Sequence, residues 1–329
     1  MSNSRRKKSK KGIGLIIVLV VVLLIAGSGV FVVNHYLNKI NRVEEIETVP
    51  PESEDFETET NVDLVEMAPE EVEWGEIEPL MDDDLLNILL VGQDRRPGQG
   101  RQRSDSMIVC SINFETKQIA MISFLRDLYV QIPGYTDNRL NAAYVFGGFP
   151  LLKDTLNVNF GITVDGCFEV DFTGFTTLID KIGGVDVSLT ATEARIVGGG
   201  AEEGLNHLDG EHALTYARIR KIDSDFQRTD RQRKVLLACF EKVKQRSLKE
   251  MLSLLDEALP YLTTDMTNSQ IYSIASKLFP LVNNAEINTY HIPPDGTYSN
   301  LYIRGMAILY PDLGTIRNIL ANEYLPLSK

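Results

Sequence analysis

The chain has 329 residues, of which 43% are hydrophobic, and 46 Asp and Glu against 33 Lys and Arg give a formal net charge of −13. Such an acidic chain is disfavoured as a nucleic-acid binder, because that role needs a surplus of Lys and Arg facing the phosphates. The three cysteines are odd in number and widely spaced, and no two of the four histidines have a metal-ligand spacing. We therefore expect no disulfide framework, and buried free thiols at Cys110, Cys167 and Cys239.

The chain begins with a basic segment followed by a long apolar run. Residues 1–12 hold six Lys and Arg, and residues 13–33 are apolar apart from small residues. About twenty residues at roughly 1.5 Å each cross a hydrocarbon core about 30 Å thick. Positive charge before the span keeps that end in the cytoplasm. The pattern predicts an uncleaved signal anchor over 13–33, with everything downstream outside the cell. The alternative is a cleaved signal peptide with a small-residue site at 26–29, although the run is longer than a usual signal-peptide core.

An acidic stretch follows the apolar run. Between Val43 and Leu86 there are 18 Asp and Glu, several prolines and no Lys or Arg. Low hydrophobicity and charge repulsion are typical of extended, disordered segments, so we expect residues 34–84 to form an extracellular linker. Residues 85–329 carry 28 acids and 25 bases. A local group of arginines there is therefore not outweighed by the rest of the domain.

Residues 85–329 are numerous enough for one large domain with a sizeable core. Strand-like apolar runs alternate with helical patterns, which predicts an α/β fold: a three-layer α/β/α sandwich around a mixed central sheet. The expected strands are 85–92, 106–113, 118–124 and 184–189. The expected helices are 141–146, 151–159, 172–181, 210–217, 229–259 and 268–281.

Charged residues stand where the first three strands begin or end. Asp94 follows the first strand, Asp105 precedes the second, and Arg126 and Asp127 follow the third. Functional groups on α/β sheets gather at strand ends. If the first two strands are antiparallel neighbours, Asp94 and Asp105 approach one another and suit Mg²⁺ beside phosphate oxygens. The plainer interpretation is that each Asp caps a turn.

A group of arginines lies in the second half of the chain. An extended backbone puts Arg218 and Arg220 on one side. A helix that begins near residue 229 puts Arg228, Arg231 and Gln232 on one face. Several guanidinium groups in one place predict a site for a highly charged anion, most simply a phosphate or pyrophosphate. The alternative is a solvated helix face that carries charges of both signs.

Several different short motifs follow one another along the chain. They are 90–98 (LVGQDRRPG), 103–107 (RSDSM), Arg126 and Asp127 with 132–134 (IPG), 139–144 (RLNAAY), 180–187 (DKIGGVDV), 208–220 (LDGEHALTYARIR), 225–228 (DFQR) and 230–233 (DRQR). In this order and spacing they resemble the LytR-CpsA-Psr (LCP) family over nearly all of residues 85–329. Proteins of that family are typically tethered outside the membrane of Gram-positive bacteria, which agrees with the predicted anchor.

The resemblance implies a phosphotransferase. Such an enzyme moves a glycopolymer, for example teichoic acid or capsule, from an undecaprenyl pyrophosphate carrier to peptidoglycan, with Mg²⁺ at the pyrophosphate. The residues implied for pyrophosphate binding are Arg103, Arg126, Arg218, Arg220, Arg228 and Gln232. The resemblance associates Asp94 and Asp105 with the metal, and Asp105, Arg126 and Asp225 with catalysis. Either Asp105 or Asp225 is the candidate base for the acceptor hydroxyl.

Two other functions share these features. A polyprenyl-pyrophosphate hydrolase would use water at the same site, and a membrane-anchored regulator of the cell envelope would bind without catalysis. The long lipid of a transferase or hydrolase needs an apolar channel. The candidates for its lining are Phe168, Phe172, Phe175, Leu178, Ile179 and Leu236, each of which could instead serve ordinary core packing.

Overall fold

The computed structural model describes residues 34–43, 48, 56, 58, 64–75, 77–95, 99–220, 222–244, 246, 250, 253–254, 257–278 and 286–328. The predicted basic tail (1–12) and membrane anchor (13–33) lie outside these residues. Within them, no helix combines the length and the apolar character needed to cross a membrane.

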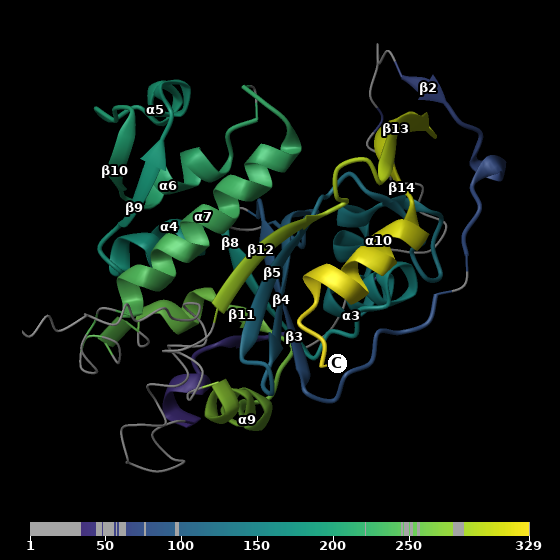
Figure 1. The fold of residues 1–329 in the computed structure, drawn as a ribbon. Helices are drawn as coiled ribbons and strands as arrows, with labels where there is room; N and C mark the ends of the chain where they lie inside the picture. Colours follow the sequence, from purple (N-terminus) through teal and green to yellow (C-terminus); the bar gives the residue numbers. More distant parts are fainter. Residues whose placement is uncertain are drawn as a thin grey trace, which may run out of the picture.

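The described residues form a mixed central sheet of seven strands in the order β1-β11-β8-β3-β4-β5-β12 (Figure 1). Strand β3 pairs antiparallel with β4 and parallel with β8, and β5 pairs antiparallel with β4 and parallel with β12. The bounds are β1 (Asn41–Arg42), β11 (Thr263–Thr264), β8 (Gly166–Asp171), β3 (Leu85–Gln93), β4 (Ser104–Asn113), β5 (Gln118–Phe124) and β12 (Glu286–Ile292). The predicted mixed sheet is confirmed.

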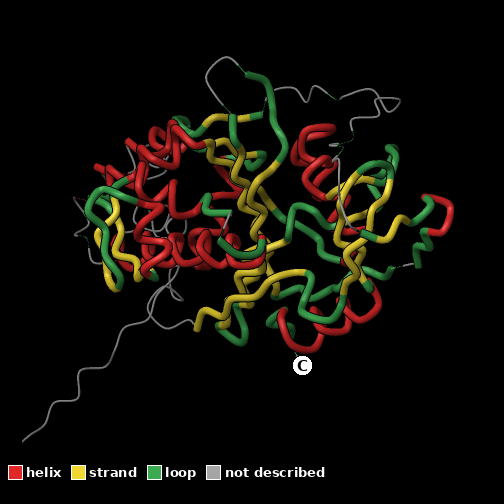
Figure 2. Tube along the Cα trace, turned by 90° about the horizontal axis from the view of Figure 1, so that it is seen from above, coloured by secondary structure: helices red, strands yellow, loops and turns green. Residues whose placement is uncertain are grey.

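Helices cover both faces of this sheet (Figure 2). One face carries α4 (Phe172–Lys181), α7 (Asp225–Lys244) and α9 (Asn268–Leu278), and the other carries α3 (Leu140–Phe160) and α10 (Leu313–Ile319). Each face buries its own cluster of apolar side chains. Strand β5 is apolar or small at nearly every position because neither of its faces meets water.

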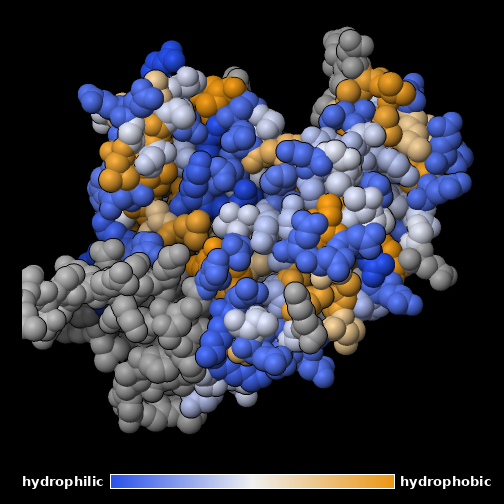
Figure 3. All heavy atoms as spheres, in the orientation of Figure 1, coloured by the Kyte–Doolittle hydropathy of each residue, from blue (hydrophilic) through white to orange (hydrophobic). Residues whose placement is uncertain are grey.

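Of the three smaller sheets among the described residues, two stand beyond the central one, and the third is the pair of β6 (Tyr129–Val130) and β7 (Asn138–Arg139). The first is an antiparallel hairpin, β9 (Val185–Leu189) and β10 (Gly204–Leu208), beside α5 (Ala191–Val197) and α6 (Gly210–Ala217). The second joins β13 (Tyr298–Ile303), β14 (Met306–Pro311) and β2 (Val65–Glu66). Figure 3 shows the surface hollowed between these two parts. The remaining short elements are the 3₁₀ helices η1 (Pro69–Glu71) and η2 (Leu259–Tyr261), and the π-helix η4 (Leu320–Tyr324).

The predicted strands correspond to β3, β4, β5 and β9, and the helices predicted at 172–181 and 210–217 are α4 and α6. The helices expected at 141–146 and 151–159 are the two segments of α3, which are separated by a kink at the non-helical Gly148, where φ is 63°. Helix α7 begins at Asp225 rather than near residue 229 and ends at Lys244. The helix predicted for 229–259 therefore begins too late and is interrupted after Lys244, whereas residues 250, 253–254 and 257–258 within its predicted second half are helical.

The segment predicted as an acidic linker differs from the prediction where it is described. Strand β1 joins the edge of the central sheet, and Leu37 and Ile40 just before it are buried. Further on, β2 pairs with β13, and Trp74 stacks on Tyr129 and donates a hydrogen bond to Asp137 at 2.7 Å. These apolar side chains find partners on the domain, so parts of residues 34–84 belong to the folded structure.

Candidate active site

The end of the β3–β4 pair brings together the two aspartates that the sequence singled out. Because the strands are antiparallel neighbours, Asp94 after β3 and Asp105 in β4 lie at the same end of the sheet. Gly92 pairs with Ser106 and Gln93 with Ser104, which leaves Asp105 as the extra residue of a bulge. Bulges re-aim side chains next to functional sites, and here the re-aimed side chain is a carboxylate.

Arginines from two separate segments reach these carboxylates. Arg126, after β5, and Arg220, after α6, each donate to Oδ1 of Asp105 at 3.0 Å. Arg218, at the end of α6, lies 3.4 Å from Asp94. The guanidinium of Arg218 also lies over the Phe172 ring, 4.4 Å from its centre. The predicted arginine cluster and the strand-end acids therefore form one site.

Arg228 is the most deeply buried member of this site, with 1% of its surface exposed. Nη2 donates to Asp225 at 2.6 Å, whereas Nε and Nη1 have no hydrogen-bond partner among the described residues. The side-chain oxygen of Gln232, one turn further along α7, is also unsatisfied. Burial lowers the pKa of Arg228 to about 10, against the opposing effect of Asp225. Buried donors are rarely left without acceptors, so this arrangement is suited to an oxygen-rich anionic ligand.

Asp225 combines burial with a nearby cation. It is the first residue of α7, where the helix dipole favours a negative charge. Burial raises its pKa above the usual carboxyl value, and repulsion from Asp127 acts in the same direction, while Arg228, Arg126 and Arg220 oppose both. A carboxylate with a raised pKa is a stronger proton acceptor than an ordinary one.

Behind the charged groups the site opens into an apolar tunnel. Its mouth is lined by charged and polar side chains (Asp105, Arg218, Arg220, Arg228 and Gln232) and by apolar ones such as Phe172 and Leu214. Beyond them lies a cavity of about 160 Å³ between the sheet and helices α4, α7 and α9. Leu90, Val91, Val170, Phe175 and Leu236 line both parts, so the two are continuous.

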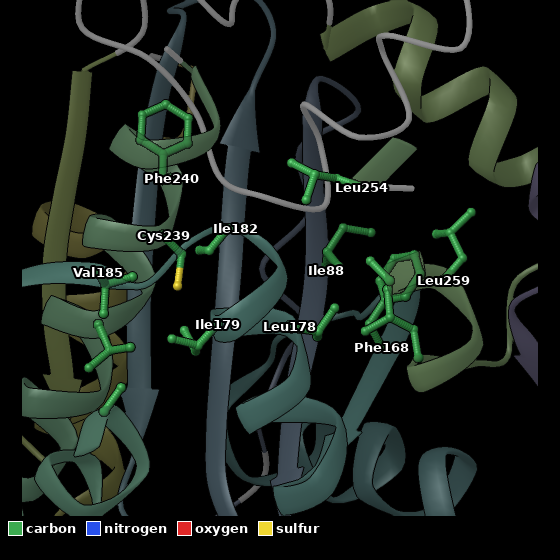
Figure 4. Close-up of a cluster of buried hydrophobic side chains, with 14 of the residues drawn as sticks. Ile88, Phe168, Leu178, Ile179, Ile182, Val185, Cys239, Phe240, Leu254 and Leu259 are labelled. Atoms are coloured by element: carbon green, nitrogen blue, oxygen red, sulfur yellow. The ribbon is translucent and has the colours of Figure 1, made fainter. Parts of the chain in front are cut away.

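The residues that the sequence proposed for a lipid channel do line this tunnel. Phe168, Phe175, Leu178, Ile179 and Leu236 line the cavity, and Phe172 lines its mouth. Figure 4 shows Phe168, Leu178 and Ile179 in the apolar cluster together with Ile88 and Cys239, which also line the cavity. All three cysteines are free, as predicted, but only Cys167 and Cys239 are buried, whereas Cys110 is partly exposed. Burial raises the pKa of Cys239 to about 12.

Two of the predicted arginines contact other parts of the chain. Arg103 donates to Asn141 at 3.2 Å and lies over the Phe146 ring. Arg231, grouped with Arg228 in the sequence, donates to Glu193 at 2.7 Å and to the carbonyl oxygen of Ile219 at 3.1 Å, and it also pairs with Asp223. It belongs to a separate buried cluster.

A supporting network near Asp94 was not foreseen. Glu169 of β8 is buried, and it accepts hydrogen bonds from the Gln93 amide and the Tyr144 hydroxyl. Arg95 lies 3.3 Å from the same carboxylate. Gln93 in turn accepts from the backbone amide of Gln102 at 2.9 Å. The network fixes both ends of the loop that carries Asp94, and it was missed because β8 itself was not predicted.

The carboxylates leave room for only a partial metal shell. Across the residues that the structure describes, no group of three or more His, Cys, Asp or Glu side chains could hold a metal ion. Asp94 and Asp105 offer two carboxylates at the end of one hairpin. A hard cation held by one or two carboxylates completes its shell with water and phosphate oxygens.

Comparison with known proteins decides the family. A model of the LytR_cpsA_psr family matches residues 43–321. The chain belongs to this family. Among LytR_cpsA_psr relatives, it is 31% identical over 227 residues to the regulatory protein MsrR of Staphylococcus aureus, covering 68% of this chain and 69% of the relative. It is 32% identical over 318 residues to the polyisoprenyl-teichoic acid–peptidoglycan teichoic acid transferase TagU of Oceanobacillus iheyensis, covering 91% and 92%.

Solved LytR_cpsA_psr structures share the fold. A structure of TagT bound to LIIa-WTA is 26% identical with a TM-score of 0.60, and the match covers 76% of this chain and 96% of that one. TagV of Bacillus subtilis is 27% identical with a TM-score of 0.59, and the match covers 76% and 100%.

Proposed function

We propose that this protein transfers a glycopolymer from a polyisoprenyl pyrophosphate carrier to peptidoglycan. The observation that carries the proposal is a group of arginines, one with unsatisfied buried donors, at the mouth of an apolar tunnel. A polyisoprenyl pyrophosphate has the matching chemistry, since its head is a doubly phosphorylated anion and its tail is a long hydrocarbon. The relative TagU is named for the transfer of teichoic acid from such a carrier to peptidoglycan.

The donor binds with its pyrophosphate at the mouth and its lipid in the tunnel. The guanidinium donors there come from Arg218, Arg220 and Arg228. Arg126, at the end of β5, is linked to the mouth by its hydrogen bond to Asp105. Bidentate contacts between Arg and phosphate are strong and directional. The pyrophosphate oxygens would accept hydrogen bonds from the unsatisfied N–H groups of Arg228. The glycopolymer would extend outward into solvent.

The reaction breaks the phosphoanhydride bond of the pyrophosphate and forms a phosphodiester link between the glycopolymer and the acceptor. A hydroxyl oxygen of the acceptor sugar attacks the phosphorus that carries the glycopolymer, and the bond from that phosphorus to the bridging oxygen breaks. The lipid phosphate leaves with the bridging oxygen and its electron pair. The arginines stabilise the charge that develops on it. The hydroxyl proton passes to a carboxylate.

We assign the proton to Asp225 rather than to Asp105. One oxygen of Asp105 already accepts hydrogen bonds from two guanidinium groups. Asp225 has one cationic partner, Arg228, and a raised pKa. Positioned general bases contribute about a hundred- to ten-thousandfold to a rate.

We also propose Mg²⁺ as the cofactor, held by Asp94 and Asp105 together with oxygens of the pyrophosphate. When bound, the ion would supply additional positive charge for the phosphate oxygens. The two carboxylates belong to different strands of one hairpin, and each already lies beside an arginine that faces the same ligand.

A membrane location follows from the chemistry of the donor. We propose that residues 13–33 anchor the chain, with residues 1–12 in the cytoplasm and the domain outside, where peptidoglycan is found. Protease added to intact cells should degrade the domain and leave a small membrane-embedded N-terminal fragment. Recovery of a soluble mature protein that starts near Gly29 would contradict the anchor.

The test of function uses the full-length chain in detergent with Mg²⁺, a lipid-pyrophosphate oligosaccharide and peptidoglycan fragments. A transferase yields glycopolymer attached to peptidoglycan together with lipid phosphate, in equal amounts and only when the acceptor is present. A hydrolase yields lipid phosphate at the same rate without acceptor. A binding protein retains the lipid and yields neither product, which would refute the proposal.

A further inference from the structure

Three aromatic side chains gather beside Asp225, outside the tunnel. The Phe226 and His291 rings lie 5.1 Å apart at 73°, and the Phe226 and Tyr298 rings lie 5.3 Å apart at 32°. They come from the start of α7, the end of β12 and the start of β13. All three remain partly exposed, and none lines the tunnel or its mouth.

The position of this aromatic cluster along α7 separates it from the donor. Leu236 and Cys239 of the same helix line the tunnel, and Arg228 lies at its mouth. Phe226 lies near the start of the helix, two residues before Arg228. At about 1.5 Å per residue, it is roughly 15 Å along the helix axis from Leu236. In Figure 1 the end of β12 rises between the start of α7 and β13.

The cluster adjoins groups that hydrogen-bond hydroxyls. Phe226 directly follows Asp225, and both Asp225 and Asp127 keep about a fifth to a quarter of their side chains exposed, 22% and 24%. The Nδ1–H of His291 donates to the carbonyl oxygen of Pro293 at 2.9 Å, because a carbonyl can only accept. This contact leaves Nε2 as the ring nitrogen that can meet a sugar hydroxyl.

This combination has the chemistry of a carbohydrate subsite. One face of a pyranose ring is made of C–H groups, which pack against the flat face of an aromatic ring, while its hydroxyls need polar partners at the rim. In phosphoryl transfer the attacking and leaving oxygens stand roughly in line across the phosphorus. With the lipid phosphate leaving toward the tunnel, the attacking sugar approaches from the opposite end of α7.

We propose that Phe226 and Tyr298, with His291, form the subsite for the acceptor sugar, stacking its ring so that its hydroxyl faces Asp225. The proposal rests on the transferase function and specifies where the acceptor binds. It predicts that the acceptor is selected by a sugar ring rather than by its peptide part.

The test compares Phe226→Leu and Tyr298→Leu with Tyr290→Leu in the full-length chain. Leucine keeps an apolar side chain but removes the aromatic face. Tyr290 is a matched control, since it precedes His291 on β12 yet stacks on Tyr324, with ring centres 4.0 Å apart. Losing one aromatic stack should raise the KM for soluble peptidoglycan oligosaccharides about three- to tenfold. The KM for the lipid donor should stay unchanged, and Phe226→Tyr should restore the acceptor KM.

Two results would overturn the subsite. One is an unchanged acceptor KM in folded Phe226→Leu and Tyr298→Leu proteins. The other is a raised donor KM with an unchanged acceptor KM, which would assign the cluster to the first sugar of the glycopolymer. Direct binding of the same oligosaccharides, followed by saturation-transfer NMR, keeps the test independent of turnover. If the wild-type chain binds them without transferring polymer and the leucine variants lose that binding, the subsite stands and the transferase function fails.

Discussion

Arg228 and Arg231 stand three residues apart on α7, and both are almost fully buried, with 1% and 3% of their surfaces exposed. Arg231 is enclosed by Glu193, Asp223 and a backbone carbonyl. Burial disfavours its charge, but these partners outweigh burial, and the pKa of Arg231 is raised. Arg228 has one carboxylate and two donors without partners. The donors of Arg231 therefore have partners within the protein. Those of Arg228 are partly unsatisfied, and we propose that the pyrophosphate accepts from them.

The largest expected effect is the loss of transfer rate when the carboxylate of Asp225, beside Arg228, is removed. Asp225→Asn keeps the size of the side chain and an oxygen that accepts from Arg228, but it removes the proton acceptor. Transfer should fall about a hundred- to ten-thousandfold, while donor binding changes little. Single-turnover assays with saturating donor measure the loss. A normal rate in this variant would return the role of base to Asp105.

Arg231→Ala should act on stability. The change leaves Glu193 buried without its cationic partner, and breaking a buried ion pair costs about 3–5 kcal/mol. Urea unfolding followed by circular dichroism measures this, with Arg228→Ala as the matched control. Donor affinity of the folded fraction should stay normal. If Arg231→Ala instead weakened donor binding without destabilising the fold, the contrast between the two arginines would be wrong.

Arg228→Ala should act on binding. Two charge-assisted hydrogen bonds to the donor would be lost, at about 1.5–3 kcal/mol each, and donor affinity should fall by about a hundredfold or more. Arg228→Lys should recover little, because an ammonium lacks the planar fork. Titration with a polyisoprenyl pyrophosphate in detergent provides the measurement. Unchanged affinity in the folded variant would assign Arg228 to structure as well.

The smallest expected effect is a shift in the pH profile. Asp225 acts only when deprotonated, and burial raises its pKa, so the transfer rate should rise with pH through a midpoint above that of an ordinary carboxyl. Arg228, Arg126 and Arg220 lower this pKa, and Asp127 raises it. Arg228→Ala should therefore move the midpoint upward, whereas Arg231→Ala should leave it in place. A profile that is flat across the acidic range would exclude a titrating base.

The sequence predicted those parts of the site that local patterns encode. Strands β3, β4 and β5 are nearly continuous apolar runs because helices bury both their faces, so their ends and the charged residues there could be located. Strand β12, with the sequence EINTYHI, lies at the edge of the sheet and mixes polar with apolar positions. The spacing of its apolar residues did not indicate a strand, so the aromatic cluster at its end was not predicted.

Other errors came from contacts between residues far apart in the chain. Arg228 and Arg231 share a helix and a residue type. Their roles are separated by the contacts of Arg231 with Glu193, 38 residues away, and with Asp223 and the carbonyl oxygen of Ile219. The contacts of Arg103 with Asn141 and Phe146 of α3 likewise join residues far apart in the chain. The spacing of residues along the chain does not predict such long-range contacts.

Strand β1 has a mechanical consequence. It joins the edge of the central sheet through Asn41 and Arg42, and β2 attaches the chain again at Val65 and Glu66. The chain is therefore attached to the domain on both sides of the acidic residues between these strands. Under the proposed topology, the few residues before β1 set the height of the tunnel mouth above the lipid bilayer. Insertions between β1 and β2 would leave that height unchanged.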